Sequence, residues 1–145
     1  VQMDADGSHR PDDLPLVVEA AAENRLVIGS RWVPGGAVLN WPWYRQWISR
    51  AGNLYARLTL RSHVKDITAG FRCYPVSFLT GLELELVRAQ GYGFQIEMTK
   101  LAQDSGVAVE EVPITFVERE SGVSKMTYKI IFEAFWLCTK WAFRR

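Results

Sequence analysis

A short apolar run, Leu26-Val27-Ile28-Gly29, does most to restrict the folds open to this 145-residue chain. It lies between a polar start and a glycine, which is typical of a buried strand. The opening residues 1–3 have strand character, and a proline with two following aspartates predicts a helix over residues 11–23. Strand, helix and strand in this order predict an α/β sheet.

The remaining elements are predicted from the spacing of apolar residues and from the positions of glycine and proline. Two prolines and two glycines make residues 31–42 an irregular and moving loop, and a second loop is expected over 118–124. The patterns predict helices over 43–61, 94–105 and 125–143, and strands over 71–74 and 107–114.

Charge is unevenly distributed along the chain, although Lys and Arg exceed Asp and Glu by one in total. Residues 25–72 hold eight bases and one acid, residues 125–145 hold five bases and one acid, and the other two segments are acidic. All six tryptophans fall in the two basic segments. With a nearly neutral total and no nucleic-acid-binding motif, we expect no nucleic-acid partner.

The two basic segments each contain a predicted helix with an aromatic face. In 43–61, a spacing of about 100° per residue places Trp43, Trp47, Ala51, Leu54 and Leu58 on one face, with arginines along its edge. Such a stripe is either part of the core or a surface that lies in a membrane interface, and the flanking bases favour the interface. In residues 125–145, aromatic residues with flanking bases likewise favour a membrane interface over the core. No apolar run is long enough to span a bilayer.

Two cysteines, Cys73 and Cys138, lie far apart and lack metal-type spacing, which favours buried free thiols over a disulfide or zinc site. The chain also lacks a P-loop, a zinc-protease motif and a nucleophile elbow. Kinase, zinc-protease and serine-hydrolase activities therefore have no support in the sequence.

A carboxylate pair, Asp4 and Asp6, follows the opening strand. Such a pair can hold a hard divalent cation that bridges the oxygens of a diphosphate, although an Asp-x-Asp turn is also a common capping device. His9 is nearby, but a single histidine favours a hydrogen-bonding role over metal ligation.

Several basic residues are candidates for binding phosphate: Arg31, Arg45 and Arg119, with Ser124 and Lys125 after Gly122. The alternative for each arginine is ordinary surface charge. Asp66 begins a turn that ends at Arg72. It either forms an ion pair with Arg72 inside the turn or faces a reaction centre.

Six ordered motifs resemble the polyprenyl-phosphate (dolichyl-phosphate) mannosyltransferases of glycosyltransferase family 2, over essentially the whole chain. The Gly-Ser-His ending of the first motif and the Asn-Trp-Pro loop are most similar to actinobacterial polyprenol monophosphomannose synthases. The motifs are Met3-Asp4-Ala5-Asp6-Gly7-Ser8-His9, Val27-Ile28-Gly29-Ser30-Arg31, Asn40-Trp41-Pro42, Asp66-Ile67-Thr68-Ala69-Gly70-Phe71-Arg72, Gly91-Tyr92-Gly93-Phe94-Gln95-Ile96-Glu97 and Glu118-Arg119-Glu120-Ser121-Gly122-Val123-Ser124-Lys125.

The resemblance implies a GT-A (Rossmann-like) glycosyltransferase fold, of which residues 1–145 are the C-terminal part, following a nucleotide-binding portion. It implies inverting transfer of mannose from GDP-mannose to polyprenyl phosphate, which supplies glycan, lipoglycan or protein mannosylation. Transfer of another sugar, such as glucose from UDP-glucose, and a non-catalytic membrane-binding remnant are the alternatives. The implied location is peripheral, at the cytoplasmic face of the plasma membrane.

The resemblance also assigns roles to residues. Asp4 and Asp6 are expected to hold Mg²⁺ or Mn²⁺ on the donor diphosphate, with Ser8, His9 or water completing the coordination, because the family's usual glutamine is Ser8 here. The five phosphate-binding candidates are expected to surround the acceptor phosphate and the leaving diphosphate, with Arg119 and Asp66 as catalytic residues. Asp66 is expected to orient groups near the acceptor. No strong base is needed, since a phosphate monoester is largely deprotonated at neutral pH.

Overall fold

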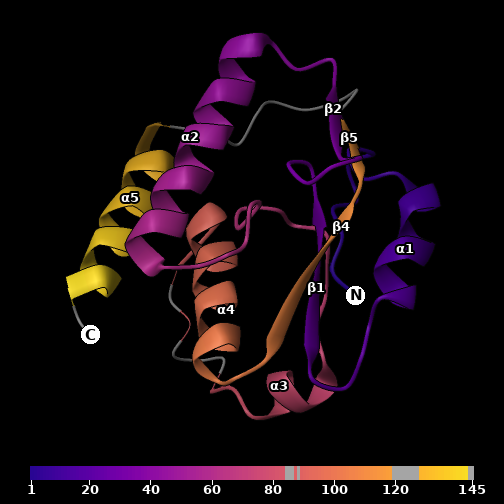
Figure 1. The fold of residues 1–145 in the computed structure, drawn as a ribbon. Coiled ribbons are helices and arrows are strands. Elements are labelled where there is room, and N and C mark those ends of the chain that lie inside the picture. The colour runs from indigo at the N-terminus through magenta and orange to yellow at the C-terminus, as the bar shows by residue number, and fades with distance from the viewer. Residues whose placement is uncertain (84–86, 88, 119–127, 144–145) are drawn as a thin grey trace.

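The computed structural model describes residues 1–83, 87, 89–118 and 128–143, and its centre is a small mixed sheet (Figure 1). Helices pack on both faces of this sheet. After a single 3-10 turn, Pro11–Asp13, the elements in chain order are α1 (Leu14–Glu19), β1 (Arg25–Ser30), β2 (Ala37–Leu39), α2 (Trp43–Leu60), β3 (Arg72–Cys73), α3 (Val76–Thr80), α4 (Tyr92–Asp104), β4 (Ala108–Pro113), β5 (Thr115–Val117) and α5 (Tyr128–Phe143).

The central strand of the sheet is β1, which lies between β3 and β4. It runs parallel to β4, from Arg25 beside Ala108 to Ser30 beside Pro113, and antiparallel to β3. Beyond β3, Gln2 pairs with Arg72 through two backbone hydrogen bonds of 2.7 and 2.9 Å. The opening residues therefore lie beside β3, but they form a single bridge at Gln2 and not the strand that was expected.

The two faces of β1 are buried in two different clusters, because successive side chains of a strand point to opposite sides. Leu26 and Ile28 pack into a large cluster with residues of α2, α4 and α5. Val27 packs on the other side with Val17 of α1, Phe71 and Ile114. This burial on both faces confirms the interpretation of the apolar run as a buried strand and the prediction of an α/β sheet.

Most of the predicted elements are present, with shifted ends. The helix predicted over 43–61 is α2, and the strands predicted over 26–29 and 107–114 are β1 and β4. The helix predicted over 11–23 ends earlier, since α1 stops at Glu19 and the chain turns back to bridge Ala22 with Arg25. Residues 118–127 of the predicted loop and last helix lie outside the described residues, apart from Glu118.

The prediction that residues 31–42 contain no regular structure was wrong. Within this segment β2 pairs in parallel with β5, with Ala37 beside Thr115 and Leu39 beside Val117. The prolines and glycines lie outside the three paired residues, so they do not interrupt the ladder. This pair of short strands brings the end of the segment next to the residues after β4.

Candidate functional site

A polar cavity of about 190 Å³ lies beyond the carboxyl end of β1. Clefts at the carboxyl ends of parallel strands are the usual place for ligand sites in α/β folds. The walls of the cavity come from the opening turn, the end of β1, the start of α2, the turn after α2 and the start of α4: Asp4, His9, Gly29, Arg31, Trp41, Arg45, Thr68, Ala69, Gly70, Gly91, Tyr92, Gln95, Ile114 and Phe116.

The main charged feature of this cavity is a buried ion pair between Arg31 and Asp66. The guanidinium donates from Nε to Oδ2 (2.8 Å) and from Nη2 to Oδ1 (2.7 Å), and the Arg31 backbone N–H also donates to Oδ2 (2.9 Å). Arg31 is 6% exposed and Asp66 is fully buried. Burial opposes the charge of Arg31, but the Asp66 carboxylate outweighs it and raises the pKa of the guanidinium. Arg31 is therefore a fixed cation at the cavity wall.

The position of Asp66 is set by residues of β4 and α2 and by Arg31. Glu111 of β4 accepts the backbone N–H groups of Lys65 and Asp66, each at 2.8 Å. Asn53 of α2 donates to Thr68 Oγ1 and accepts the Thr68 backbone N–H, both at 3.2 Å. Thr68 in turn accepts from Arg31 Nη2 at 3.1 Å. The turn after α2 is thus held by hydrogen bonds on both sides of Asp66.

The alternative of an ion pair between Asp66 and Arg72 is wrong. Arg72 is fully buried and donates instead to the carbonyls of Ile67, Ala69 and Gln95 and to Thr99 Oγ1. It ties the Asp66 turn to α4, while Arg31, 35 residues before Asp66, is the partner of the carboxylate. Burial lowers the pKa of Arg72. Its hydrogen bonds to these oxygen atoms give Arg72 a structural role.

The second predicted phosphate-binding arginine, Arg45, forms an ion pair with Glu118 and lies over the Trp41 ring at 4.2 Å. This pair joins the first turn of α2 to the residue after β5. Since both side chains are partly exposed, the pair is more accessible to solvent than the pair of Arg31 and Asp66.

The two aspartates of the opening turn differ in their surroundings. Asp6 Oδ1 accepts hydrogen bonds from the backbone N–H and the hydroxyl of the buried Ser8. The carboxylate of Asp4 lies close to Gly70. A Cβ added to Gly70 would be 3.7 Å from each Asp4 carboxylate oxygen. Among the described residues, no three His, Cys, Asp or Glu side chains are grouped closely enough to hold a metal ion.

His9 is almost fully buried and has a hydrogen-bonding role. Its Nδ1 accepts the Asp4 backbone N–H at 3.0 Å, and its ring lies 5.1 Å from Phe71 and 5.3 Å from Phe116. Burial lowers the pKa of the imidazole, against the opposing effect of Asp4. The ring is therefore neutral near pH 7 and fixes the turn that carries Asp4.

Three residues that line the polar cavity have a buried polar atom with no hydrogen-bond partner in the described part of the chain. These atoms are Arg45 Nε, Trp41 Nε1 and Gln95 Oε1. An unsatisfied buried polar group costs about 1–3 kcal/mol. Two donors and one acceptor left in this state on one cavity indicate a polar ligand.

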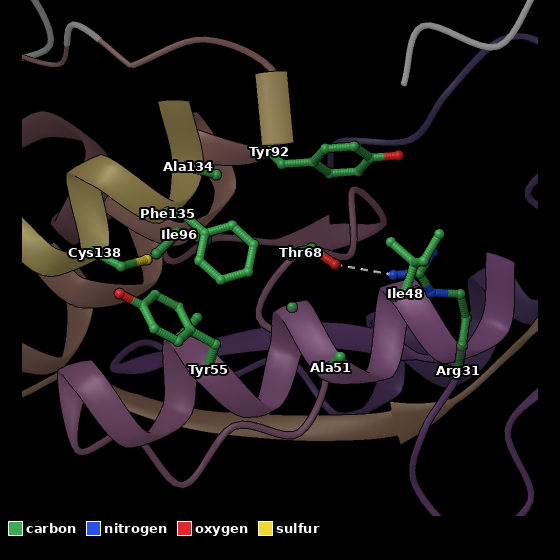
Figure 2. A pocket seen from close by; sticks show the side chains of 13 residues that line it. Arg31, Ile48, Ala51, Tyr55, Thr68, Tyr92, Ile96, Ala134, Phe135 and Cys138 are labelled. Atoms are coloured by element: carbon green, nitrogen blue, oxygen red, sulfur yellow. Dashed lines mark hydrogen bonds between the residues drawn. The ribbon is translucent and has the colours of Figure 1, made fainter. Parts of the chain in front are cut away.

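A second cavity, of about 230 Å³ and mostly apolar, lies between α2, α4 and α5 (Figure 2). Tyr55, Phe135 and Cys138 gather at one end, and Arg31 and Thr68 lie at the other. Both cysteines are free thiols, as predicted, but only Cys138 is buried, and Cys73 is partly exposed. Burial raises the pKa of Cys138 to about 11. Arg31, Thr68 and Tyr92 also line the polar cavity, so the two cavities share a wall.

The aromatic stripe of α2 lies on the surface. Trp43, Trp47 and Leu58 are 74%, 69% and 70% exposed, while Asn53, Ala56 and Leu60 are the buried residues of this helix. Within this chain the stripe is therefore exposed and is not part of the core. On α5 the side chains divide: Trp136 is exposed, whereas Trp141 packs against the large core cluster. None of the helices in the described part of the chain is long and apolar enough to cross a membrane.

The structure brings Asp4, Arg31, Arg45 and Asp66 together around one cavity or its wall. Arg119, Ser124 and Lys125 lie outside the described residues. Sequence reasoning assigned no role to Gln95, Tyr92 or Trp41, although each lies in a motif that carries the family resemblance. The available signal was their position in those motifs, where Tyr92 lies between two glycines and Trp41 precedes a proline.

Comparison with known proteins gives consistent matches. The sequence model of Glycosyl transferase family 2 matches residues 1–81. The chain is 50% identical over 141 residues to the undecaprenyl-phosphate mannosyltransferase of Micrococcus luteus, covering 97% of this chain and 58% of that protein. It is 48% identical over 145 residues to the polyprenol monophosphomannose synthase of Mycolicibacterium smegmatis, covering 99% and 55%.

A more distant relative is the dolichol-phosphate mannosyltransferase of Pyrococcus furiosus, 39% identical over 136 residues, covering 92% of this chain and 37% of that protein. The chain thus spans little more than half the length of the two bacterial relatives. The mixed sheet with its parallel β1 and β4 agrees with the GT-A fold expected from the sequence. The chain belongs to glycosyltransferase family 2.

Proposed function

We propose that the protein containing this chain transfers mannose from GDP-mannose to a polyprenyl phosphate with inversion at the sugar carbon, giving a β-linked polyprenyl phosphomannose for later mannosylation reactions. The names of the three relatives support the mannosyl group and the lipid phosphate acceptor. The identity of the nucleotide and the later use of the product rest on the sequence resemblance alone.

The strongest structural support for a lipid phosphate as the acceptor is the wall that the two cavities share. Arg31, Thr68 and Tyr92 face a polar cavity on one side and an apolar cavity on the other. A polyprenyl phosphate has one charged end and one hydrocarbon end, so it matches this division. In our proposal the phosphate binds at Arg31 and the first isoprene units lie against Tyr55 and Phe135.

Charge neutralisation is the main catalytic task in this proposal. The attacking atom is a phosphate oxygen that is already anionic at neutral pH, and the donor diphosphate is anionic too. Hydrogen bonds to Asp66 and Thr68 use Nε and Nη2 of Arg31, which leaves Nη1 for a phosphate oxygen. A cation that is already in place needs no reorganisation when the negative charges approach each other. Asp66 acts as a positioning residue because both its oxygens hold Arg31.

A divalent cation, Mg²⁺ or Mn²⁺, fits the opening turn. Mg²⁺ is typically held by one or two carboxylates together with water and substrate phosphates. Asp4 lines the polar cavity and Asp6 lies two residues further along the same turn, and an ion held there would neutralise charge on the leaving diphosphate. We propose water as the further ligand, since the Ser8 hydroxyl bonds to Asp6 and His9 Nδ1 accepts from Asp4.

The remaining candidates extend the same scheme. Arg45 lines the polar cavity and has an unsatisfied Nε, so we propose that it contacts a phosphate oxygen from the side opposite Glu118. Arg119, Ser124 and Lys125 are proposed, from the family motif alone, to bind the acceptor phosphate and the leaving diphosphate. Gln95 and Trp41 add polar groups to the same cavity.

The exposed aromatic faces of α2 and of the 125–145 segment are proposed to lie in the membrane interface, where the lipid acceptor resides. Trp43, Trp47 and Trp136 are the exposed tryptophans of these faces. Trp141 is not suited to test this contact, because its loss would also disturb the core. The location proposed for the enzyme is peripheral, at the cytoplasmic face of the plasma membrane.

Sugar transfer by the full-length protein tests the proposal. The protein is incubated with polyprenyl phosphate, Mn²⁺ and either labelled GDP-mannose or labelled UDP-glucose. Lipid labelled from GDP-mannose, and lost in Asp6→Ala, is the expected result. Labelling from UDP-glucose alone would keep the lipid acceptor and reject the donor, and no labelling by a folded, vesicle-bound protein would favour a non-catalytic remnant.

A further inference from the structure

A third cavity, of about 140 Å³, lies on the outer side of α2, away from the mostly apolar cavity. Its walls are Trp32 from the segment after β1, four residues of α2 and one residue of the turn after α2: Trp32, Arg50, Asn53, Leu54, Arg57 and Lys65. Trp32 is the residue next to Arg31, but none of the six lines the proposed catalytic cavity.

Three of the six wall residues are cations, and none is acidic. Arg50, Arg57 and Lys65 form no ion pair with any residue that the structure describes. Glu111 is close to Lys65 in the fold, but its two oxygens accept the backbone N–H groups of Lys65 and Asp66. The cavity therefore has a net positive charge with no neutralising carboxylate in its wall.

Two buried N–H donors in this cavity also lack a partner among the described residues. They are Trp32 Nε1 and Arg57 Nε. A buried donor without an acceptor is unfavourable, so native structures usually provide a partner for it. Since the wall offers donors and positive charge, an anion with several acceptor oxygens would satisfy both donors and the cations together.

We propose that this cavity binds a phosphate-type oxyanion, and that its source is the phosphodiester of an anionic membrane lipid. The wall residue Leu54 is half-exposed and belongs to the aromatic stripe of α2, so the cavity opens beside that stripe. On the helix, Arg50 and Arg57 follow the edge of the stripe. A lipid whose phosphate enters the cavity would lay its acyl chains along Trp47 and Leu58.

This inference deepens the membrane contact proposed above and does not rest on the sugar-transfer reaction. The Arg50 guanidinium lies 4.6 Å from the centre of the Trp32 ring, and the Arg31 guanidinium lies 5.6 Å from the same ring. Asn53 also lines the cavity, and its side chain donates to Thr68 Oγ1. The lipid site and the proposed catalytic site are neighbours, but they use different cations.

The first test compares vesicle binding of single variants in the full-length protein. Arg57→Gln removes a wall cation, and Arg61→Gln removes an exposed cation of the same helix end that does not line the cavity. On phosphatidylglycerol vesicles we expect about a 30-fold loss of affinity for Arg57→Gln, and about fivefold or less for Arg61→Gln. Equal losses would show general attraction to the surface and would overturn the site.

Lys65→Gln provides a second variant on a turn, in case Arg57→Gln disturbs the helix. Its loss of vesicle affinity is also expected to exceed that of Arg61→Gln. Sugar transfer to a detergent-dissolved acceptor is expected to remain unchanged in both variants, because neither residue lines the catalytic cavity. Lost vesicle binding with normal transfer therefore separates this inference from the proposed function.

The second test observes the Trp32 indole N–H directly by NMR, with Trp32→Phe to assign its resonance. Inorganic phosphate and a short-chain phosphatidylglycerol are titrated separately. A shift with both ligands, or with the lipid alone, supports the site and its lipid source. A shift with inorganic phosphate alone keeps the oxyanion site and rejects the lipid source, and no shift with either ligand overturns the inference.

Discussion

The two cavities that share Arg31, Thr68 and Tyr92 have opposite character. The polar cavity contains charged residues and three unsatisfied polar atoms. The mostly apolar cavity is lined by side chains such as Tyr55, Ile96 and Phe135. The difference shows that the fold places a polar space and a mostly apolar space next to each other, with these three side chains lining both. A ligand that is charged at one end and apolar at the other fits both.

The cavities also differ in how they would bind the proposed ligand. In the polar cavity, the cost of burying a cation is offset within the protein, because Asp66 holds Arg31 in place before any ligand arrives. In the apolar cavity, binding energy would come from burying the hydrocarbon of the proposed acceptor, at about 25 cal/mol per Å². Changes on the polar side are therefore expected to affect stability and catalysis, and changes on the apolar side to affect the affinity for lipid.

The largest effect is expected for Asp66→Asn on the polar side. This change leaves the Arg31 cation buried without its carboxylate, which costs about 3–5 kcal/mol of unfolding free energy. We also expect sugar transfer to fall by more than about 100-fold, since a misplaced cation cannot stabilise the reacting phosphates. Urea unfolding and a transfer assay on the folded protein measure the two effects.

Glu118→Gln is the matched control, because it removes the carboxylate from the other ion pair of the polar cavity. The side chains of Arg45 and Glu118 are 15% and 30% exposed, so the expected loss is about 1 kcal/mol or less. Losses of similar size in the two variants would mean that the buried pair has no special role.

A smaller effect is expected on the apolar side from Gly52→Leu in α2. An added Cβ at Gly52 meets no atom within 4 Å, and this residue lines the apolar cavity. A leucine in place of glycine inside a helix is expected to stabilise the protein by about 0.5–1 kcal/mol. Because its side chain would fill the cavity, we expect the KM for polyprenyl phosphate to rise about tenfold while the KM for the sugar donor is unchanged.

Gly52→Ala separates these two effects. It gives the same gain in helix stability but leaves most of the cavity open, so its KM for the lipid is expected to stay close to that of the unchanged protein. If Gly52→Leu binds the lipid normally, the acceptor chain does not use this cavity.

The smallest effect concerns pH and the opening turn. Since burial lowers the pKa of His9 in the folded protein, the unfolded chain takes up a proton first as the pH falls through about 6.5. Stability is then lost from pH 7 towards pH 5, and it is fully present above the unfolded pKa. In His9→Asn, which keeps an acceptor for the Asp4 N–H, we expect a flatter stability profile over this range; an unchanged slope would exclude His9 as its source.

The sequence predicted the fold best where one local pattern decides the structure. The apolar run of β1 and the helical spacing of α2 are local patterns, formed by residues close together in the sequence. Both elements could therefore be predicted. Periodicity shows that a helix has an apolar face, but it does not show whether that face is buried. The neighbouring arginines were the sequence evidence that Trp43 and Trp47 are exposed. The pair of β2 and β5 was missed because three residues are too few to form a pattern.

The candidate site was predictable in its residue types more than in its connections. Arg31 and Asp66 were both identified, but their pairing depends on the return of the chain after α2, which no local signal shows. Arg72 appeared as the partner of Asp66 because the two residues are close in sequence. The orphaned polar atoms of Trp41 and Gln95 become visible only when the whole cavity is assembled. The roles of all the site residues remain predictions, and Arg119, Ser124 and Lys125 also lie outside the described residues.

The most direct measurement is a structure of the full-length protein with farnesyl phosphate bound. If one ligand joins the two cavities, its phosphate will lie beside Arg31 in the polar cavity. Its isoprenoid chain will pass Thr68 and Tyr92 to lie against Tyr55 and Phe135. A phosphate bound away from Arg31, or a chain lying outside on the α2 stripe with the apolar cavity empty, would contradict this account.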